Sequence, residues 1–325
     1  MPNISIIIPA YNAEATIMET IESVQQQTFS DFELIVINDG STDRTLKLLQ
    51  SIKDERLKVF SYENGGLSTA RNRGISHVTG EFIAFLDADD LWAPDKLELQ
   101  LTALQQHPEA GVAYSWTYFM DEKEGGRSFH PCEPVFFEGN VYDKLLVGDF
   151  IYNGSNTLIR KQVIDSVGGF DPEINACADW DYWVRLAARW NFVVVPKHQV
   201  FYRRFSGAMS SQVEMMKQTS LKAIEKAFRA APPELQYLKK PCLTSFNLYS
   251  ANLYLQHSKD MEGVNQVGSH LWQAICLKPS ILLSLGTQKM IVKFLLMRII
   301  SPKLTSHLLS LKTKVRPKAN PLLQG

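Results

Sequence analysis

The feature that most constrains the fold is a repeated alternation of short apolar runs with amphipathic stretches along the first 106 residues. The apolar runs cover residues 4–9, 32–37, 57–62 and 82–86, and helices are expected at about 13–26, 43–52, 67–77 and 94–106. Strands that alternate with helices build a sheet covered by helices on its faces. We therefore expect an α/β fold with a Rossmann-like mixed sheet flanked by helices.

The pattern changes beyond residue 108. A strand is expected at 112–120, then a strand, a helix and a turn within 156–170, a helix at 179–190, and two strands in NFVVVP and QVFYRRF. From about residue 215 the pattern is helical throughout. We predict one domain over 1–215, with halves of about 1–107 and 108–215, and a mostly helical C-terminal extension over 216–325.

The charge of the chain is unevenly distributed, although its formal net charge is zero. The 63 residues after Glu262 contain nine Lys or Arg and no Asp or Glu, whereas the first 262 contain 25 basic and 34 acidic residues. Hydrophobic residues make up 45% of the chain, which is typical of a globular protein. The basic extension suggests an anionic surface as partner.

Several classes of protein are excluded by what the sequence lacks. The four cysteines lie far apart without a CxxC pair, so we expect buried reduced thiols and no zinc ribbon or disulfide framework. HExxH, GxxxxGK[ST] and GxSxG motifs are absent, and no GxGxxG follows the first strand. The first 12 residues lack the basic region and cleavage site of a signal peptide, which indicates a cytoplasmic location.

The densest group of charges is DADD, which contains Asp87, Asp89 and Asp90 directly after an apolar strand. Asp87 and Asp89 lie on the same side of an extended backbone. They could share Mg²⁺ or Mn²⁺, which prefer oxygen ligands and often combine one or two carboxylates with substrate phosphates. The alternative is that Asp89 or Asp90 caps the helix that starts near Pro94.

The loop VINDGSTD follows the second strand. We expect Ser41 and Asp43 to cap the next helix, because Ser and Asp are favoured there. Asp39 ends the strand itself, where its carboxylate could accept hydrogen bonds from a nucleotide base N–H or a ribose hydroxyl.

Two more loops belong to the same predicted sheet edge. In PAYN, Tyr11 could stack on a base while Pro9 and Ala10 offer backbone groups. In NGGLSTARNRG the two glycines let the backbone approach a ligand, and Arg71 and Arg73 lie on the following helix. Arginine suits a diphosphate, although a solvated helix face explains one of the two equally well.

The segment ADWDYWVRL begins a strongly predicted helix. Asp179 and Asp181 stand at its N-terminus, where carboxylates are favoured, so capping is one reading. Trp180 and Trp183 interleave with them, and an aromatic face beside a carboxylate is typical of a sugar site. At i, i+3 spacing, Trp183 and Leu186 are expected to face the core.

The motifs IIIPAYNAEATI, VINDGSTD, NGGLSTARNRG, FIAFLDADD, VGGFD and ADWDYWVRL occur in an order that resembles glycosyltransferase family 2, with its GT-A fold, over about residues 3–210. The resemblance implies an inverting hexosyltransferase that uses a nucleotide-diphosphate sugar, with a UDP-sugar expected, and Mn²⁺ or Mg²⁺. The implied acceptor is a saccharide or lipid-linked saccharide in cell-surface polysaccharide or glycolipid synthesis, with no nucleic-acid partner.

The resemblance also implies roles for individual residues. The donor would contact Pro9, Ala10, Tyr11, Glu14, Asp39, Asn64, Arg71, Asp87 and Ala88. Asp89, together with Asp87, would hold the metal. Asp179 fills the place of the catalytic base, with Trp180 and Asp181 in the acceptor site. The chain departs from the family at Phe205, where members often have His, and this puts one metal or diphosphate contact in doubt.

Two other functions stay open at this point. A sugar nucleotidyltransferase uses a related sheet, but a Gly-rich phosphate loop would be expected where this chain has PAYN. A carbohydrate-binding pseudoenzyme of the same fold would be consistent with Phe205, whereas the presence of Asp87, Asp89 and Asp179 argues against it.

The apolar runs at 280–286 and 290–300 are too short and too interrupted by charge to span a bilayer. We expect an interfacial helix that places the protein peripherally on the inner face of the cell membrane. Its apolar face would contain Ile291, Phe294, Leu295, Arg298 and Ile299. The alternative is a helical subdomain that packs this face against the catalytic domain.

Overall fold

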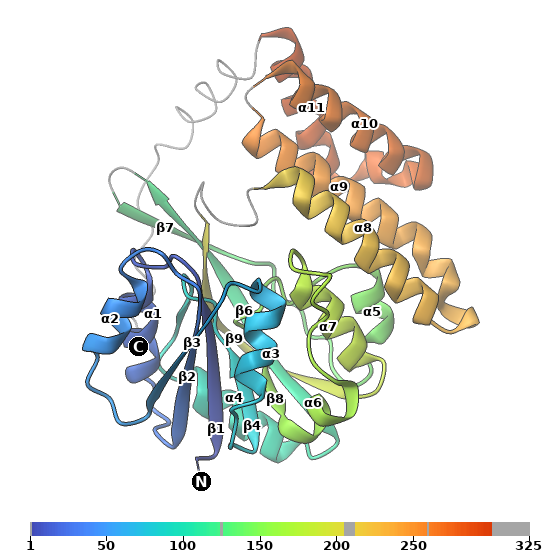
Figure 1. Cartoon of the computed structure of the whole chain (residues 1–325). Coiled ribbons are helices and arrows are strands. Elements are labelled where there is room, and N and C mark those ends of the chain that lie inside the picture. Colours follow the sequence, from blue (N-terminus) through green and yellow to red (C-terminus); the bar gives the residue numbers. More distant parts are fainter. Residues whose placement is uncertain (1, 124–125, 205–211, 259, 301–325) are drawn as a thin grey trace. The chain divides into compact units, whose positions relative to one another are not determined.

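The computed structural model describes residues 2–123, 126–204, 212–258 and 260–300. These residues form two compact units, shown along the chain in Figure 1. The first contains residues 2–145 and 149–204, and the second contains 146–148 and 212–300. Phe205, at which the sequence departs from the family pattern, lies outside the described residues.

The first unit is built on a mixed sheet of nine described strands in the order β3-β2-β1-β4-β8-β6-β9-β5, with β7 paired to β6. The strands are β1 Ile4–Ala10, β2 Phe32–Asp39, β3 Leu57–Tyr62, β4 Phe82–Phe85, β5 Leu91–Trp92, β6 Ala110–Lys123, β7 Gly126–Pro131, β8 Leu158–Arg160 and β9 Asn191–Arg204. Strands β1 to β4 pair in parallel, and β6 pairs in parallel with β9. β8 is antiparallel to both of its neighbours, β4 and β6.

Seven helices accompany the sheet in the first unit (Figure 1). They are α1 Ile17–Gln25, α2 Thr45–Ser51, α3 Leu67–Ile75, α4 Lys96–Gln106, α5 Tyr142–Val147, α6 Lys161–Val167 and α7 Ala178–Ala187. Alternate residues of β1 point to opposite faces, so Ile6 joins the core formed with α1 and α4. Ile7 faces α3, where a Cβ at Gly74 would lie 2.3 Å from its side chain. Glycine at this position therefore lets α3 lie close to the sheet.

The predicted α/β fold class and the four predicted N-terminal strands are confirmed, but some elements differ. The two strands predicted in NFVVVP and QVFYRRF are one strand, β9, as far as the described residues extend, because the register shift opposite Tyr114 and Trp116 accommodates Pro196, which cannot donate a ladder hydrogen bond. The short β5 and the polar β7 were not predicted. The four cysteines, all among the described residues, form no disulfide bond; Cys132 and Cys242 are buried as expected, but Cys177 is only partly buried and Cys276 is exposed, so the expectation of burial was wrong for these two.

The second unit contains the helices α8 Val213–Ala230, α9 Lys239–His257, α10 Met261–Leu277 and α11 Leu285–Ile299, with short 3₁₀ turns at Pro233–Leu238 and Pro279–Leu283. Its core includes Leu255, Val267 and Met297, and Ile291 and Phe294 of α11 pack against it. The expected membrane-facing surface was therefore wrong for these last two residues. Among the described helices, none has the length and apolar character needed to span a bilayer.

Candidate functional site

The candidate site lies at the carboxyl edge of the sheet. Strands β1, β2, β4, β6 and β9 all end there, because each is parallel to the others through the sheet pairings. β8 runs in the opposite direction, so the segment that precedes it reaches the same edge. Loops from distant parts of the sequence therefore meet at one place, as in other open α/β sheets.

The DADD loop is fixed by contacts with two other segments. The backbone N–H of Asp87 donates to Ser155 Oγ at 3.0 Å, and this hydroxyl donates to Asp90 at 2.5 Å. Asp90 is fully buried and also accepts the backbone N–H of Arg203 at 2.9 Å. Arg203 Nε donates to the carbonyl oxygen of Asp89 at 2.6 Å. The capping alternative is wrong, because Asp95 occupies the N-cap position of α4 and no described side chain caps it, while Asp90 holds the loop to β9 and to the segment before β8.

Asp87 and Asp89 are the carboxylates of this loop that retain some exposure. Asp87 accepts a hydrogen bond from Arg71 Nη2 at 2.6 Å. Burial and the charge of Asp87 raise the pKa of Asp89 to about 7. Among the described residues, no three His, Cys, Asp or Glu side chains converge into a metal site. Two carboxylates fit a Mg²⁺ or Mn²⁺ ion that takes its other ligands from phosphates and water.

Arg71, the arginine of NGGLSTARNRG that the family resemblance assigns to the donor site, is held in a specific geometry. The side chain is 1% exposed, and its guanidinium lies 5.0 Å from the Phe170 ring centroid. Its Nε and Nη1 have no hydrogen-bond partner among the described residues. A Cβ at Gly154 would lie 2.1 Å from Nη2, so a glycine there makes room for the guanidinium. These two nitrogen atoms carry three N–H groups that an anionic ligand could accept.

Asp39 is buried at the end of β2 and is fully engaged by the following loop. Its carboxylate accepts the backbone N–H groups of Gly65 and Gly66 at 2.9–3.1 Å, and Arg73 Nη1 at 2.6 Å. Asn64 donates its amide to the carbonyl oxygen of Asp39 at 3.0 Å. These bonds occupy about four acceptor positions of the carboxylate. In this structure Asp39 organises the loop at residues 64–66.

Four further predicted donor contacts are Pro9 and Ala10, which end β1, Tyr11, which follows them, and Ala88 of the DADD loop. Pro9 and Ala10 are buried, whereas Tyr11 is 54% exposed and so has a ring face open to solvent. Ala88 is buried, and its carbonyl oxygen accepts two threonine hydroxyl groups at 2.8 and 3.0 Å. Tyr11 is therefore the residue of this group with surface available for stacking.

Glu14 lies beside the start of α2. Its carboxylate accepts the backbone N–H of Arg44 at 3.0 Å and Arg44 Nε at 3.1 Å. These hydrogen bonds lower the pKa of Glu14. Asp43 accepts the backbone N–H of Thr45, the first residue of α2, at 2.9 Å, but Arg44 occupies the N-cap position of α2 without a side-chain capping hydrogen bond among the described residues, so the prediction that Ser41 and Asp43 cap this helix was wrong. Ser41 Oγ instead accepts the backbone N–H of Asn12 at 3.1 Å.

Asp179 lies in the first turn of α7, after Cys177 with its left-handed φ of 57°. Burial raises the pKa of Asp179, and the positive charge of Arg71 opposes this. Asp149 is close enough that burial and the charge of Asp179 together raise the pKa of Asp149 to about 7. The site thus brings Asp179, Asp149 and the Arg71–Asp87 pair within electrostatic range.

The position of α7 relative to α3 is set by the VGGFDPE loop. Asn72 of α3 donates to the carbonyl oxygen of Phe170 at 2.8 Å and accepts its N–H at 2.7 Å. Ser68 Oγ donates to the carbonyl oxygen of Ile174 at 2.6 Å. A Cβ at Gly169 would lie 2.3 Å from Asn72 Oδ1. This close docking holds Asp179 near Arg71, which is also on α3.

Trp180 and Asp181 face protein partners in this structure. Trp180 is 8% exposed, and its indole N–H donates at 2.9 Å to a backbone carbonyl oxygen of α5. Asp181 is 3% exposed and pairs with Arg185 at 2.9 Å. Trp183 is fully buried, which confirms its predicted core position.

Four residues that shape the site were not assigned a role from the sequence. They are Asp149, Gly154, Ser155 and Arg203. The only signal for the first three is a turn-rich stretch, DFIYNGSN, before a predicted strand. Arg203 is 3% exposed and pairs with Glu19 at 2.7 Å. The sequence gives no sign of this burial, because a basic residue at the end of a strand is usually exposed.

The comparisons with known proteins agree with this geometry. The model named Glycosyltransferase like family 2 matches residues 5–251, so the chain belongs to that family. An uncharacterized glycosyltransferase of Rickettsia bellii is 40% identical over 187 residues, which cover 57% of this chain and 26% of the relative. WfgD of Escherichia coli, a UDP-Glc:alpha-D-GlcNAc-diphosphoundecaprenol beta-1,3-glucosyltransferase, is 43% identical over 102 residues, covering 31% of this chain and 40% of WfgD.

The chain spans between a quarter and three fifths of the length of the first curated relatives that it matches. Among solved structures, S. aureus TarS 1–349 in complex with UDP-GlcNAc has a TM-score of 0.63 at 19% identity, covering 97% of this chain and 93% of that one. The mannosyltransferase PcManGT from Pyrobaculum calidifontis, in complex with GDP-Man and Mn²⁺, has a TM-score of 0.61 at 17% identity, covering 96% and 88%. These similarities show a GT-A fold.

Proposed function

We propose that residues 1–215 form the catalytic domain of an inverting hexosyltransferase, with the nucleotide-sugar site in about 1–107 and the acceptor site in about 108–215. The donor is a nucleotide-diphosphate sugar, with a UDP-sugar as first candidate. The acceptor is a hydroxyl of a saccharide or lipid-linked saccharide in cell-surface polysaccharide or glycolipid synthesis. Family membership and the activity named for WfgD support this proposal.

The observation that carries the proposal is that two buried nitrogen atoms of Arg71, Nε and Nη1, have no hydrogen-bond partner among the described residues and lie beside Asp87. A diphosphate supplies the acceptor oxygens that these groups lack. Asp89, with Asp87, would hold Mn²⁺ or Mg²⁺, which supplies positive charge for the diphosphate when bound. The proposed donor contacts are Pro9, Ala10, Tyr11, Glu14, Asp39, Asn64, Arg71, Asp87 and Ala88.

Asp179 is the proposed catalytic base. It takes the proton of the acceptor hydroxyl as that oxygen forms its bond to the anomeric carbon and the bond to the diphosphate oxygen breaks. Burial raises the pKa of Asp179, which strengthens it as a base. Negative charge grows on the leaving oxygen, and the guanidinium of Arg71 stabilises that charge. Trp180 and Asp181 are proposed to border the acceptor, and attack from the opposite face inverts the anomeric centre.

The test is an assay of the full chain with UDP-glucose, Mn²⁺ and GlcNAc-diphosphoundecaprenol, the pair in the name of WfgD, followed by other UDP-sugars. We expect release of UDP and a product with inverted anomeric configuration by NMR. A nucleotidyltransferase would release no UDP in this assay, but it would release pyrophosphate from UTP and glucose 1-phosphate in a parallel reaction. A carbohydrate-binding pseudoenzyme would release neither product with any donor, and that result would refute the proposal.

We also propose that the protein is peripheral on the cytoplasmic, anionic face of the cell membrane. Leu285, Val292, Leu295 and Ile299 of α11 are spaced by seven, three and four residues, so they share one helix face. All four are exposed, by 73%, 57%, 46% and 80%. The basic residues after Glu262 would add about 1 kcal/mol each near an anionic leaflet. Interfacial helices combine these two features.

Liposome co-sedimentation at low salt tests this second proposal. The wild-type chain should sediment with anionic liposomes and much less with neutral ones. A double variant, Leu295→Glu with Ile299→Glu, should stay in the supernatant, because both side chains are exposed and the change removes apolar surface without disturbing the helical core. A variant that binds as the wild type does would show that this face of α11 is not the contact.

A further inference from the structure

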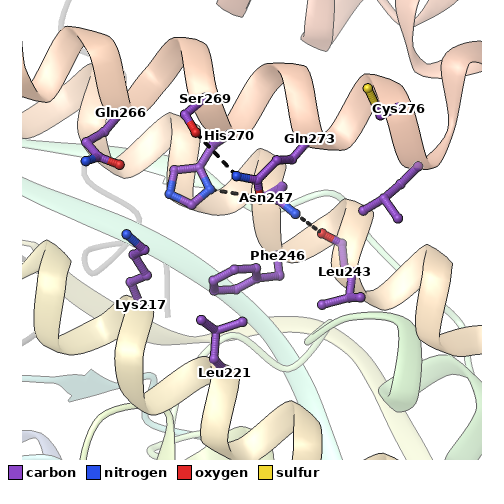
Figure 2. Close-up of a pocket in the computed structure, with 11 residues that line it drawn as sticks. Lys217, Leu221, Leu243, Phe246, Asn247, Gln266, Ser269, His270, Gln273 and Cys276 are labelled. Atoms are coloured by element: carbon purple, nitrogen blue, oxygen red, sulfur yellow. Dashed lines mark hydrogen bonds between the residues drawn. The ribbon is translucent and has the colours of Figure 1, made fainter.

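The helical unit contains a cavity that plays no part in the proposed chemistry. It has a volume of about 440 Å³, within the range of about 300–1,000 Å³ that small-molecule sites occupy. Figure 2 shows that helices α8, α9 and α10 each contribute side chains to it. Lys217 and Leu221 come from α8, Phe246 and Asn247 from α9, and His270 from α10.

The orientation of His270 is set by a short chain of hydrogen bonds. Asn247 donates its amide N–H to the carbonyl oxygen of Leu243 at 2.7 Å, so its Oδ1 is the atom that faces His270. This Oδ1 lies 2.8 Å from His270 Nδ1, which must therefore carry the hydrogen and donate it. Nε2 of the neutral ring is consequently an acceptor.

That acceptor is buried and lines the cavity without a partner. His270 is 3% exposed, and its Nε2 has no hydrogen-bond partner among the described residues. Burial and the nearby charge of Lys217 lower the pKa of His270, while Glu214 of α8 opposes this, so the ring is neutral near pH 7. Buried polar atoms are nearly always paired, and an exception calls for an explanation such as an absent ligand.

The groups around the cavity select the chemistry of that ligand. Lys217 can only donate hydrogen bonds, and His270 Nε2 can only accept one. A hydroxyl group satisfies both, because it can donate one hydrogen bond and accept another. An anion is disfavoured, because it would be repelled by the lone pair of His270 Nε2. The cation beside it would be Lys217, which already lies 3.8 Å from Glu214. Figure 2 shows the ring of Phe246 between Lys217 and Leu243, where a face of C–H groups could pack on it. Ser269, Gln266 and Gln273 add further hydrogen-bonding groups.

We propose that this cavity binds a short neutral saccharide, with one hydroxyl donating to Nε2 of His270 and accepting from Lys217. A saccharide combines several hydroxyl groups with apolar C–H faces, which matches the mixed polar and aromatic lining. Binding as such is independent of sugar transfer. The further identification of the saccharide as part of the acceptor glycan rests on the proposed function.

The experiment uses the full chain, labelled with ¹⁵N-histidine, in NMR titrations with cellobiose, maltotriose, lactose and N,N′-diacetylchitobiose. At least one sugar should shift the Nε2 signal of His270, which is assigned from its absence in His270→Phe. The affinity should fall at least tenfold in His270→Phe, which keeps an aromatic ring but removes the acceptor. Lys217→Met should weaken binding by a similar factor. Because Lys217 is partly exposed, this variant should fold normally, so it tests the cavity even if His270→Phe does not fold.

His257→Phe is the matched control, because His257 ends α9 and does not line the cavity. Its affinity should equal that of the wild type. The proposal fails if no sugar moves the His270 signal, if His270→Phe and Lys217→Met bind as the wild type does, or if inorganic phosphate gives the response instead. No donor is present in these titrations, so their failure is distinct from an absence of UDP release in the transfer assay.

Discussion

Replacement of Gly154 by alanine should disable the enzyme through a residue that has no side chain. The added Cβ would lie 2.1 Å from Arg71 Nη2 and 2.9 Å from its Cζ, so the guanidinium must leave its place. Its 2.6 Å ion pair with Asp87 would be lost, and its unpartnered N–H groups would no longer point at the proposed diphosphate position. Loss of one preorganised donor typically lowers kcat by about 10²–10³. Overpacking itself costs about 1–3 kcal/mol of stability.

The assay compares kcat and KM for UDP release with the melting temperature of each variant. Gly148→Ala is the matched control, because the nearest atoms to its added Cβ belong to Ser245, at 3.9 and 4.0 Å. Arg71→Lys should resemble Gly154→Ala in kcat, since a lysine keeps the charge but not the planar set of donors. If Gly154→Ala retains kcat within about threefold of the wild type, Arg71 does not stabilise the leaving diphosphate.

Three further predictions concern the carboxylates. Asp89→Ala, or removal of divalent cations with EDTA, should abolish metal-dependent UDP binding in calorimetry, and an unchanged affinity would remove Asp89 as the ligand. Asp179→Asn should leave donor binding near normal and lower turnover by about 10² or more, whereas a similar loss in Asp181→Asn alone would move the base to that residue. Burial raises the pKa of Glu33, but hydrogen bonds from Lys58, Ser5 and Thr79 outweigh this and lower it to about 2. The carboxylate therefore stabilises the fold above pH about 4.5 and loses this effect as the pH falls towards 2. Near neutral pH, the unfolding free energy of Glu33→Gln should be about 3 kcal/mol lower than that of the wild type. This difference between the two proteins should disappear in acid.

Three of the four N-terminal strands that the sequence predicts are uniformly buried. ISIIIP, FELIVI and FIAFL are mostly apolar because both faces of the sheet are covered there, whereas the fourth, LKVFSY, is mostly exposed or half-buried. β7 and β5 could not be predicted, because GRSFHP has no regular period and β5 is two residues long. The division of α11 into packed and exposed faces depends on tertiary contacts, since Phe294 and Leu295 are equally apolar in sequence.

Prediction of the candidate site had a similar limit. The motifs identified which polar residues stand at strand ends, but they do not show which hydrogen bonds those residues make. Asp39 looks like a free acceptor in the sequence, yet backbone N–H groups and Arg73 occupy it in the structure. Asp90 resembles its neighbours in DADD, but it is the one that is buried against Ser155. These partners lie 26–34 residues along the chain from Asp39 and 65–113 residues from Asp90, so local sequence does not reveal them.

The reversed direction of β8 bears on how a change of loop length would spread from the edge of the sheet. Because β8 is antiparallel to β4, Gly154 and Ser155 enter the edge at which Asp87 leaves it. Residues 132–141 are held to β6 and β9 instead, through a hydrogen bond from the indole N–H of Trp116 of β6 to the carbonyl oxygen of Val135 and an isolated bridge to β9. An insertion or deletion within 132–141 would therefore strain β6 and β9 first, whereas one directly before β8 would displace the support of Arg71 and of the DADD loop at once.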